Sequence, residues 1–281
     1  MQRKAATFMN GRETVENANG KHPYHVVSFS GGKDSTALLL RMLELGMPVD
    51  EIVFCDTSVE FPQMYEHLKQ VEQYTGRKIT HLSARYSFEE LLLDYEPRSR
   101  KGARHVHGLS FPSARVRWCT RWLKADVIDH YVKNLRGYCT PVQYVGIASD
   151  EAWRAKNKEY PLIRWGWTEA DCLAYCRKKG FAWGGLYDIF SRVSCWCCPL
   201  QSLEELRMLR KNFPDLWNRL LAWQERTWRT FKPNFSAQEL EERFQLEEER
   251  KRQGLSVNGR CKEFRLALRD RLRKKRVEMS V

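Results

Sequence analysis

The segment VVSFSGGKDSTALLL, residues 26–40, constrains the fold of this chain most strongly. The apolar, β-branched run 24–29 predicts a strand, two glycines follow it, and apolar spacing over 35–45 predicts a helix that stops at Gly46. A strand, a glycine loop and a helix in this order place backbone N–H groups and a helix N-terminus where an anion can bind. We therefore expect a phosphate site here, with an ordinary glycine-rich turn as the alternative.

The same alternation of strand and helix continues along the chain. Strands are expected at 51–55, 79–82 and 140–147, and a helix at 62–76. This order predicts an α/β fold with a twisted parallel sheet flanked by helices, in which ligands bind beyond the carboxyl ends of the strands. Beyond residue 200 the pattern becomes helical, and Ser236 with Glu239 predicts a helix start.

These patterns suggest three regions. Residues 1–22 form a polar N-terminal arm, 23–199 a nucleotide-binding domain with a cysteine site, and 200–281 a helical, basic C-terminal extension. Among the 281 residues, no stretch approaches the roughly 20 apolar residues of a membrane span, and the first residues lack the apolar centre of a signal peptide. The expectation is a cytoplasmic protein with no membrane partner. The net charge of +13 predicts an anionic partner such as nucleic acid, or simply a basic surface.

The glycine loop is not a Walker A loop, because Val27 stands where the first glycine is required and Asp34 follows Lys33. The string SGGKDS resembles the signature of the PP-loop ATP pyrophosphatase superfamily, the adenine nucleotide alpha hydrolase-like enzymes. Most members activate a substrate by adenylylation and release pyrophosphate in the presence of Mg²⁺. The resemblance implies catalytic roles for Lys33 and Asp34, and a site for ATP or a related adenine nucleotide formed by Ser30, Gly31, Gly32, Lys33, Asp34 and Ser35.

Two later segments are similar to the phosphoadenosine phosphosulfate (PAPS) reductase branch of this superfamily. FCDTSVEFPQMY, residues 54–65, matches the stretch that implies adenine and ribose contacts for Asp56 and Thr57, with Ser58 where glycine is usual. VGIASDEAW, residues 145–153, matches a second stretch and implies nucleotide contacts for Gly146 and Glu151. Ala148 stands where an arginine is usual, and Arg154 is a nearby substitute.

Nine cysteines in a cytosolic chain favour metal ligation, redox chemistry or burial over a disulfide framework. Cys119 followed by Lys124, and the later pair Cys195 and Cys198, are similar to the cysteines and lysine of the iron–sulfur sulfonucleotide reductases. The resemblance implies a catalytic Lys124 and metal ligands at Cys119, Cys195 and Cys198, with Cys197 as a fourth ligand or a thiol outside the site. An iron–sulfur cluster and a closed zinc site both stay open. Cys172 and Cys176, four apart on a helix, are expected in the core.

Two basic segments have two interpretations each. Residues 97–124 combine eight Lys or Arg with aromatic rings and no acid, which suits either nucleic acid or the phosphates of the nucleotide itself. Residues 260–276 carry nine Lys or Arg, and form either a phosphate-binding tail or a charged helix whose apolar side is Phe264, Leu266, Leu268 and Leu272. Residues 214–231 predict a helix with Trp217, Leu220, Leu221, Trp228 and Phe231 in the core.

Three functions compete at this point. The first is an ATP-dependent enzyme that adenylylates or sulfurates a substrate such as tRNA or DNA, with a sulfur-donor protein as a further partner. The second is a sulfonucleotide reductase, which needs a mobile C-terminal cysteine; Cys261 in NGRCKEF does not match that motif. The third is a zinc-stabilised nucleic-acid-binding module with a degenerate loop. The intact SGGKDS favours the first.

Overall fold

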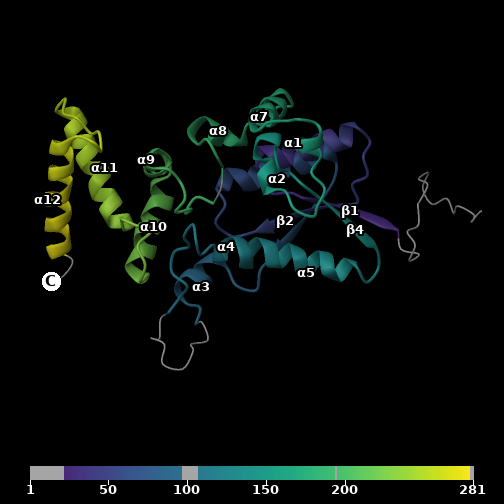
Figure 1. Cartoon of the computed structure of the whole chain (residues 1–281), viewed down its shortest axis with the longest axis horizontal. Helices are drawn as coiled ribbons and strands as arrows, with labels where there is room; N and C mark the ends of the chain where they lie inside the picture. The colour runs from purple at the N-terminus through teal and green to yellow at the C-terminus, as the bar shows by residue number, and fades with distance from the viewer. Residues whose placement is uncertain (1–21, 97–106, 194, 279–281) are drawn as a thin grey trace, which may run out of the picture. The chain divides into compact units, whose positions relative to one another are not determined.

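The computed structural model describes residues 22–96, 107–193 and 195–278, and these form two compact units (Figure 1). The first unit comprises the chain up to Phe88 together with Trp118–Cys195, and the second comprises Glu89–Arg117 together with Trp196–Val281. The basic segment expected at 97–124 is therefore divided: 107–117 belong to the second unit and 118–124 to the first, while 97–106 lie outside the described residues. All but the last residue of the expected polar arm also lies outside them.

The first unit is built on a four-stranded parallel sheet in the order β3-β2-β1-β4. The strands are β1 (Pro23–Ser28), β2 (Glu51–Asp56), β3 (Ile79–Ser83) and β4 (Thr140–Val145). In the centre, Val27 is opposite Ile52 on one side and Tyr144 on the other. The parallel α/β sheet expected from the alternating pattern is confirmed, and its strands agree with the expected ranges to within two residues.

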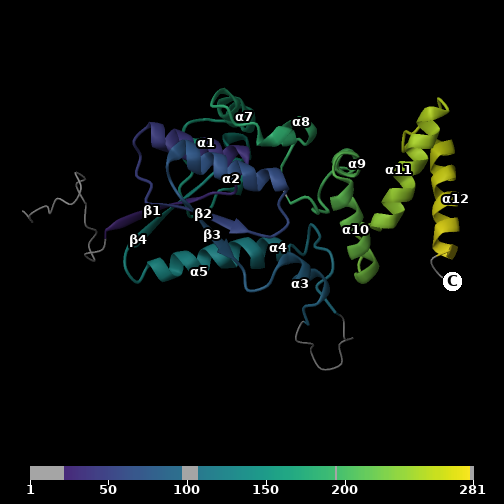
Figure 2. The ribbon, with the colours of Figure 1, turned by 180° about the vertical axis from the view of Figure 1, so that it is seen from behind.

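Helices cover both faces of this sheet. Figures 1 and 2 show α1 (Lys33–Glu44), α2 (Pro62–Thr75) and α7 (Glu169–Lys178) on one face and α5 (Asp126–Leu135) on the other. Alternate residues of a strand face opposite sides of its sheet. Val26 and Val53 face the side of α5 and pack there against Ile128 and Val132. The shorter elements are α3 (Phe88–Leu93), α4 (Trp118–Thr120), the π-helical turn η1 (Arg121–Ala125), η2 (Ser149–Arg154), α6 (Pro161–Arg164), η3 (Trp183–Gly185) and α8 (Leu186–Ile189).

A buried histidine joins three elements beneath the loop. His67 of α2 is 1% exposed, its Nε2 lies 2.9 Å from Thr36 Oγ1 of α1, and its ring stacks on Trp183 of η3 at 4.5 Å. Burial lowers the pKa of His67 to about 3, so the imidazole is neutral at physiological pH. We therefore assign His67 to the packing of the first unit.

The second unit contains four longer helices: α9 (Leu203–Asn212), α10 (Pro214–Arg226), α11 (Ala237–Arg252) and α12 (Lys262–Glu278). The prediction of a helix over 214–231 was wrong beyond Arg226. Thr227 is extended, and the side chain of Gln224 accepts a hydrogen bond from the Phe231 backbone at 2.8 Å, which stabilises a loop instead. Trp228 is consequently 52% exposed, whereas Phe231 is buried as expected.

Helices α11 and α12 pack against each other through an apolar seam. Phe264, Leu268 and Leu272 of α12 contact Leu246 of α11 in one buried cluster. The expectation that Leu266 belongs to this side was wrong, because positions 264 and 266 point to opposite sides of a helix and Leu266 is 39% exposed. The expected cap of α11 is confirmed: Ser236 Oγ accepts from the Glu239 backbone at 3.1 Å.

Throughout the part of the chain that the structure describes, no helix is both long and apolar enough to cross a membrane.

Candidate adenine nucleotide site

The glycine loop lies between the carboxyl end of β1 and the start of α1. Gly31 has a φ of 75°, a conformation that favours glycine, and a Cβ there would lie 2.4 Å from the sulfur of Met64. Trp183 Nε1–H donates to the Gly31 carbonyl at 2.7 Å. Ser35 Oγ accepts from the Ser30 backbone at 3.2 Å and lies 3.1 Å from Ser30 Oγ. The loop is thus a rigid turn in front of a 12-residue helix, the arrangement that binds phosphate groups.

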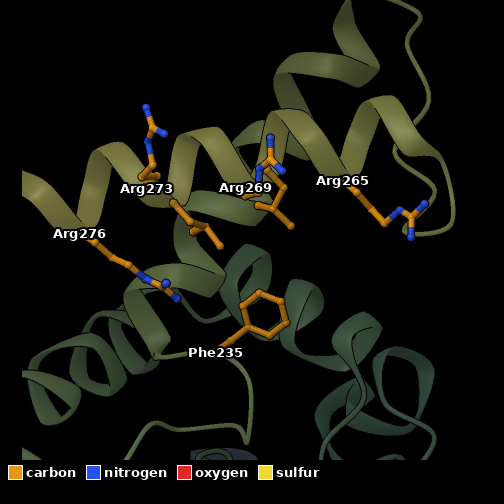
Figure 3. A pocket seen from close by; sticks show the side chains of 7 residues that line it. Phe235, Arg265, Arg269, Arg273 and Arg276 are labelled. Atoms are coloured by element: carbon orange, nitrogen blue, oxygen red, sulfur yellow. The ribbon is translucent and has the colours of Figure 1, made fainter.

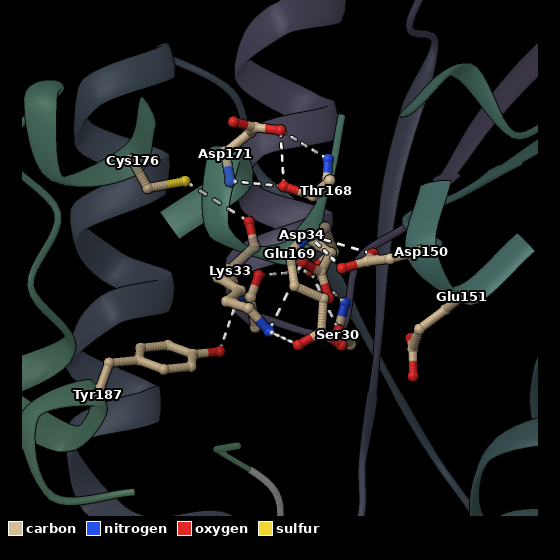
Figure 4. Close-up of polar contacts among 12 residues, drawn as sticks. Ser30, Lys33, Asp34, Asp150, Glu151, Thr168, Glu169, Asp171, Cys176 and Tyr187 are labelled. Carbon is tan, nitrogen blue, oxygen red and sulfur yellow. Dashed lines mark hydrogen bonds and ion pairs between the residues drawn. The ribbon is translucent and has the colours of Figure 1, made fainter. Parts of the chain in front are cut away.

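Lys33 is held at the first position of α1 by groups distant in sequence. Its ammonium lies 2.9 Å from Glu169 Oε2 and 3.7 Å from Asp34 Oδ1, and its backbone N–H donates to Tyr187 Oη at 2.9 Å (Figure 4). Lys33 is only 6% exposed. A buried cation beside a helix N-terminus provides a strong, localised positive charge for a phosphate group.

The two carboxylates that pair with Lys33 belong to a group of three. Asp34, Glu151 and Glu169 each offer an oxygen within 4.8 Å of the others, the one group of three or more candidate ligands found among the described residues. Burial raises the pKa of Asp34 to about 6; Lys33 opposes the shift, and Glu169, Glu151 and Asp150 add to it. Asp150 also caps α7, since its carboxylate accepts from the Glu169 backbone at 3.2 Å. Three carboxylate oxygens fit the ligand preference of Mg²⁺.

Gly146, just beyond β4, packs directly on the start of α1. A Cβ at this position would lie 2.7 Å from the Ser35 nitrogen and 2.8 Å from its Cα. Both atoms are backbone, so a side chain here would push the loop away from the sheet. Gly146 therefore shapes the site through close packing.

A second polar cluster follows β2. Thr57 Oγ1 donates to Glu60 Oε1 at 2.9 Å, Lys124 Nζ donates to the same oxygen at 3.2 Å, and Cys195 Sγ lies 3.7 Å from it. Asp56 accepts from the Tyr65 hydroxyl at 2.8 Å. Although burial opposes it, the charges of Glu60 and Cys195 raise the pKa of Lys124, which therefore remains protonated. Lys124 itself lies in the π-helical turn η1, a form of helix that is frequent at functional sites.

Ser58 stands where glycine is usual in the stretch that this segment resembles. Its φ is 62°, in the left-handed region where glycine is favoured, and its N–H donates to Asp56 Oδ1 at 2.8 Å. At the position where glycine is usual, this chain therefore has a serine in a conformation that glycine adopts easily.

The predicted metal ligands divide between the two units. Cys119 and Cys195 belong to the first unit, and Cys197 and Cys198 to the second. Each unit therefore supplies two of the four predicted ligands, fewer than the three or four thiolates that a cluster or a closed zinc site needs. Cys172 and Cys176 are fully buried, as expected, and burial raises the pKa of both thiols, so they stay protonated.

Three residues of these clusters were missed by the sequence analysis. Glu60 lies in the quoted segment 54–65, directly before its Phe-Pro pair, and that position was the available signal. Glu169 follows Thr168 at a position typical of a helix start, which gives no sign that it is a partner of Lys33. For Tyr187, 154 residues from Lys33, no sequence signal exists. Arg154, the expected substitute for an arginine at position 148, is ion-paired with Glu151 in the structure.

A rigid glycine loop with a buried lysine, at the carboxyl edge of a parallel sheet, defines a nucleotide-binding α/β domain of the PP-loop type. The chain belongs to the phosphoadenosine phosphosulfate reductase family, because the model of that domain matches residues 24–201. The family is part of the adenine nucleotide alpha hydrolase-like superfamily.

Similar proteins include two without a described activity. An uncharacterized protein of Methanocaldococcus jannaschii is 26% identical over 69% of this chain. The matched region spans only 40% of that relative's own length. An uncharacterized 37.8 kDa protein of Escherichia phage 186 is 24% identical over 71% of this chain and 74% of its own. Among solved structures, the phosphate complex of PAPS reductase from Candida auris is 20% identical with a TM-score of 0.45, covering 62% of this chain and 81% of that one.

Proposed function

We propose that this protein binds ATP, or a related adenine nucleotide, at the loop Ser30–Ser35 and uses it to activate an acceptor by adenylylation or sulfuration. The observation that carries the proposal is Lys33: a lysine only 6% exposed, at the first position of α1, directly after two glycines. Phosphate oxygens at this point would meet its ammonium and the dipole of the helix. Tyr187 and Glu169 support Lys33 in that position.

The adenylylation step is a displacement at phosphorus. A nucleophilic oxygen or sulfur of the acceptor forms a bond to the α-phosphorus, the bond from that phosphorus to the bridging oxygen breaks, and pyrophosphate leaves with the electron pair. Lys33 stabilises the negative charge that accumulates on the departing phosphates. We assign tRNA or DNA as the acceptor and a sulfur-donor protein as a partner for the sulfuration form of the reaction.

The neighbouring residues have supporting roles in this proposal. Asp34 and Glu151, with Glu169, would hold Mg²⁺, which when bound would neutralise phosphate charge. Asp56 is the last residue of β2 and Thr57 follows it, at the end of the strand that pairs with β1, and both would contact the ribose and adenine. Lys124, oriented by Glu60, would offer a cation to the acceptor side of the site.

We further propose a cysteine-ligated group held by Cys119, Cys195 and Cys198, with Cys197 as a fourth ligand. The contact of Cys195 with Thr57, at 3.6 Å between Sγ and Oγ1, supports a position next to the nucleotide site. Iron–sulfur is favoured by the resemblance of the cysteine spacing, and zinc is the alternative.

Nucleotide binding and turnover test the proposal. Lys33→Met removes the ammonium and keeps the apolar stem, so we expect ATP affinity, measured by calorimetry with Mg²⁺, to fall about 10- to 100-fold. Pyrophosphate release in the presence of tRNA or DNA should fall with it. Lys179→Met is the matched control, because Lys179 pairs with Glu44 at the far end of α1. Parent-like binding and turnover in Lys33→Met would refute the loop assignment.

A further inference from the structure

A shallow groove of about 430 Å³ runs along α12 in the second unit. Its floor is apolar and consists of Phe235, Leu268 and Leu272. Figure 3 shows the ring of Phe235 facing the helix and the arginine side chains projecting from it. The cationic residues that line the groove lie at intervals of four, four and three along the helix, and therefore on one side of it: Arg265, Arg269, Arg273 and Arg276.

The α12 arginine that faces α11 has carboxylate partners, whereas two of the four along the groove have none within the described structure. Toward α11, Arg271 pairs with Glu242 at 2.8 Å and with Glu249 at 2.7 Å. Along the groove, Arg276 pairs with Glu239, and the one carboxylate near Arg269 in the described part of the chain is the exposed Asp270, at 3.5 Å. Arg265 and Arg273 have no carboxylate within 4.0 Å among the described residues. The groove therefore carries positive charge that the fold itself does not neutralise.

The apolar side of α12 is already used by the fold. Phe264 is fully buried, and Leu268 and Leu272 are 8% and 9% exposed, in the seam with α11. A helix that binds a lipid surface needs a free apolar face to insert, and among the described side chains of α12 Leu266 is the one large apolar side chain that is exposed. The side chain of Phe235 packs against this seam but is only half-buried, and it lines the groove.

We propose that this groove, the arginine groove, binds single-stranded nucleic acid. Arg265, Arg269 and Arg273 contact successive phosphates, and the Phe235 ring packs against an unpaired base. Cationic side chains in a row with an aromatic platform are the combination that binds single strands, whereas the bases of a duplex are already stacked and cannot reach such a ring. The surface extends the proposed function by giving a nucleic-acid acceptor a place to bind.

The test measures binding of fluorescently labelled 12-nucleotide DNA and RNA by anisotropy, with no nucleotide present and at several salt concentrations. Its outcome is therefore separate from whether the loop turns over ATP. The full chain should bind with a strong salt dependence. The triple variant R265Q/R269Q/R273Q should bind at least about 30-fold more weakly at 0.1 M salt, with the slope of log affinity against log salt reduced by about 2, close to 0.7 for each lost contact. Phe235→Leu, which keeps an apolar side chain, should weaken binding about fivefold or more.

The control variant K78Q/K133Q/K178Q also removes three positive charges, from exposed positions in the first unit. It should bind nearly as the parent does. Equal losses in the two triple variants would show that only net charge matters and would overturn the proposal. A 12-base-pair duplex bound as tightly as the single strand, or binding to anionic phospholipid vesicles or polyglutamate without binding to either oligonucleotide, would overturn it as well. Preference for the DNA or the RNA strand identifies the natural class of ligand.

Discussion

At the scale of single residues, Asp34 is the carboxyl of the candidate site whose pKa is raised. Its side chain is 20% exposed, and its Oδ1 accepts no hydrogen bond in the described structure. Burial and three neighbouring acids make its ionised form costly, and the ammonium of Lys33 at 3.7 Å offsets only part of that cost. Binding of a proton or of a cation would offset this cost, and Asp34 is therefore suited to the Mg²⁺ site proposed for it.

This property predicts a pH dependence of stability. The pKa of Asp34 is about 6 in the folded protein and lies above its unfolded value, so the folded state binds more protons between about pH 4 and 6, and the free energy of unfolding falls as pH rises through that range. Two pKa units correspond to about 3 kcal/mol. Asp34→Asn should remove this contribution. The free energy of unfolding of the variant, measured with urea from pH 4 to 7, should therefore increase relative to that of the parent as pH rises.

The exposed carboxyl Asp129 of α5 offers the control, since Asp129→Asn makes the same side-chain replacement away from the loop. A constant difference between parent and Asp34→Asn across the same range would show that Asp34 ionises without cost in the folded protein.

At the scale of elements, the start of α7 determines where Glu169 lies. Thr168 and Asp171 form a capping box, in which Thr168 Oγ1 accepts from the Asp171 backbone and the Asp171 carboxylate accepts from the Thr168 backbone at 2.9 Å. The cap holds the first turn of the helix, and that turn carries the partner of Lys33. Helix α9 begins with the same device, built from Ser202 and Glu205, in the second unit.

The two caps give a matched pair of variants. Thr168→Ala and Ser202→Ala should each lower the free energy of unfolding by about 1 kcal/mol, because each leaves backbone N–H groups of a first turn without their side-chain acceptor. Only Thr168→Ala should also weaken ATP binding, by roughly two- to fivefold, since Glu169 then orients Lys33 less firmly. Urea unfolding and calorimetric titration measure the two effects. An equal loss of ATP affinity in Ser202→Ala would contradict this role of α7.

At the scale of the whole molecule, the cysteines predicted as ligands come from both units. Cys119 and Cys195 come from one unit and Cys197 and Cys198 from the other, so each unit contributes two of the predicted ligands. If the site holds an iron–sulfur group, protein purified without oxygen should contain iron and acid-labile sulfide. It should also show the visible absorbance of an iron–sulfur protein. Cys195→Ser and Cys198→Ser should each lose that absorbance and most of the iron.

Cys261→Ser serves as the control, because Cys261 packs at the edge of the α11–α12 seam and is not among the predicted ligands. Stoichiometric zinc without iron would instead indicate a closed structural site. Protein with neither metal would show that the cysteine prediction is wrong.

The sequence by itself determined the elements of the first unit and their order. The strand predicted at 51–55 is β2 (Glu51–Asp56), and the helix predicted at 62–76 is α2 (Pro62–Thr75), because both patterns reflect local periodicity and residue preferences at the ends. It also located the loop, since a parallel sheet collects its loops at one edge. The match of the family model to residues 24–201 agrees with that interpretation.

Only the tertiary structure decided which side chains meet. Glu169 lies beside Lys33 and Glu60 beside Lys124, although 136 and 64 residues separate the members of these pairs. Leu266 faces outward and Trp228 leaves its helix, because packing against neighbours sets the direction of a side chain where local preference does not. Periodicity describes one element at a time, whereas ion pairs, close glycine packing and an unbalanced row of arginines arise when elements come together.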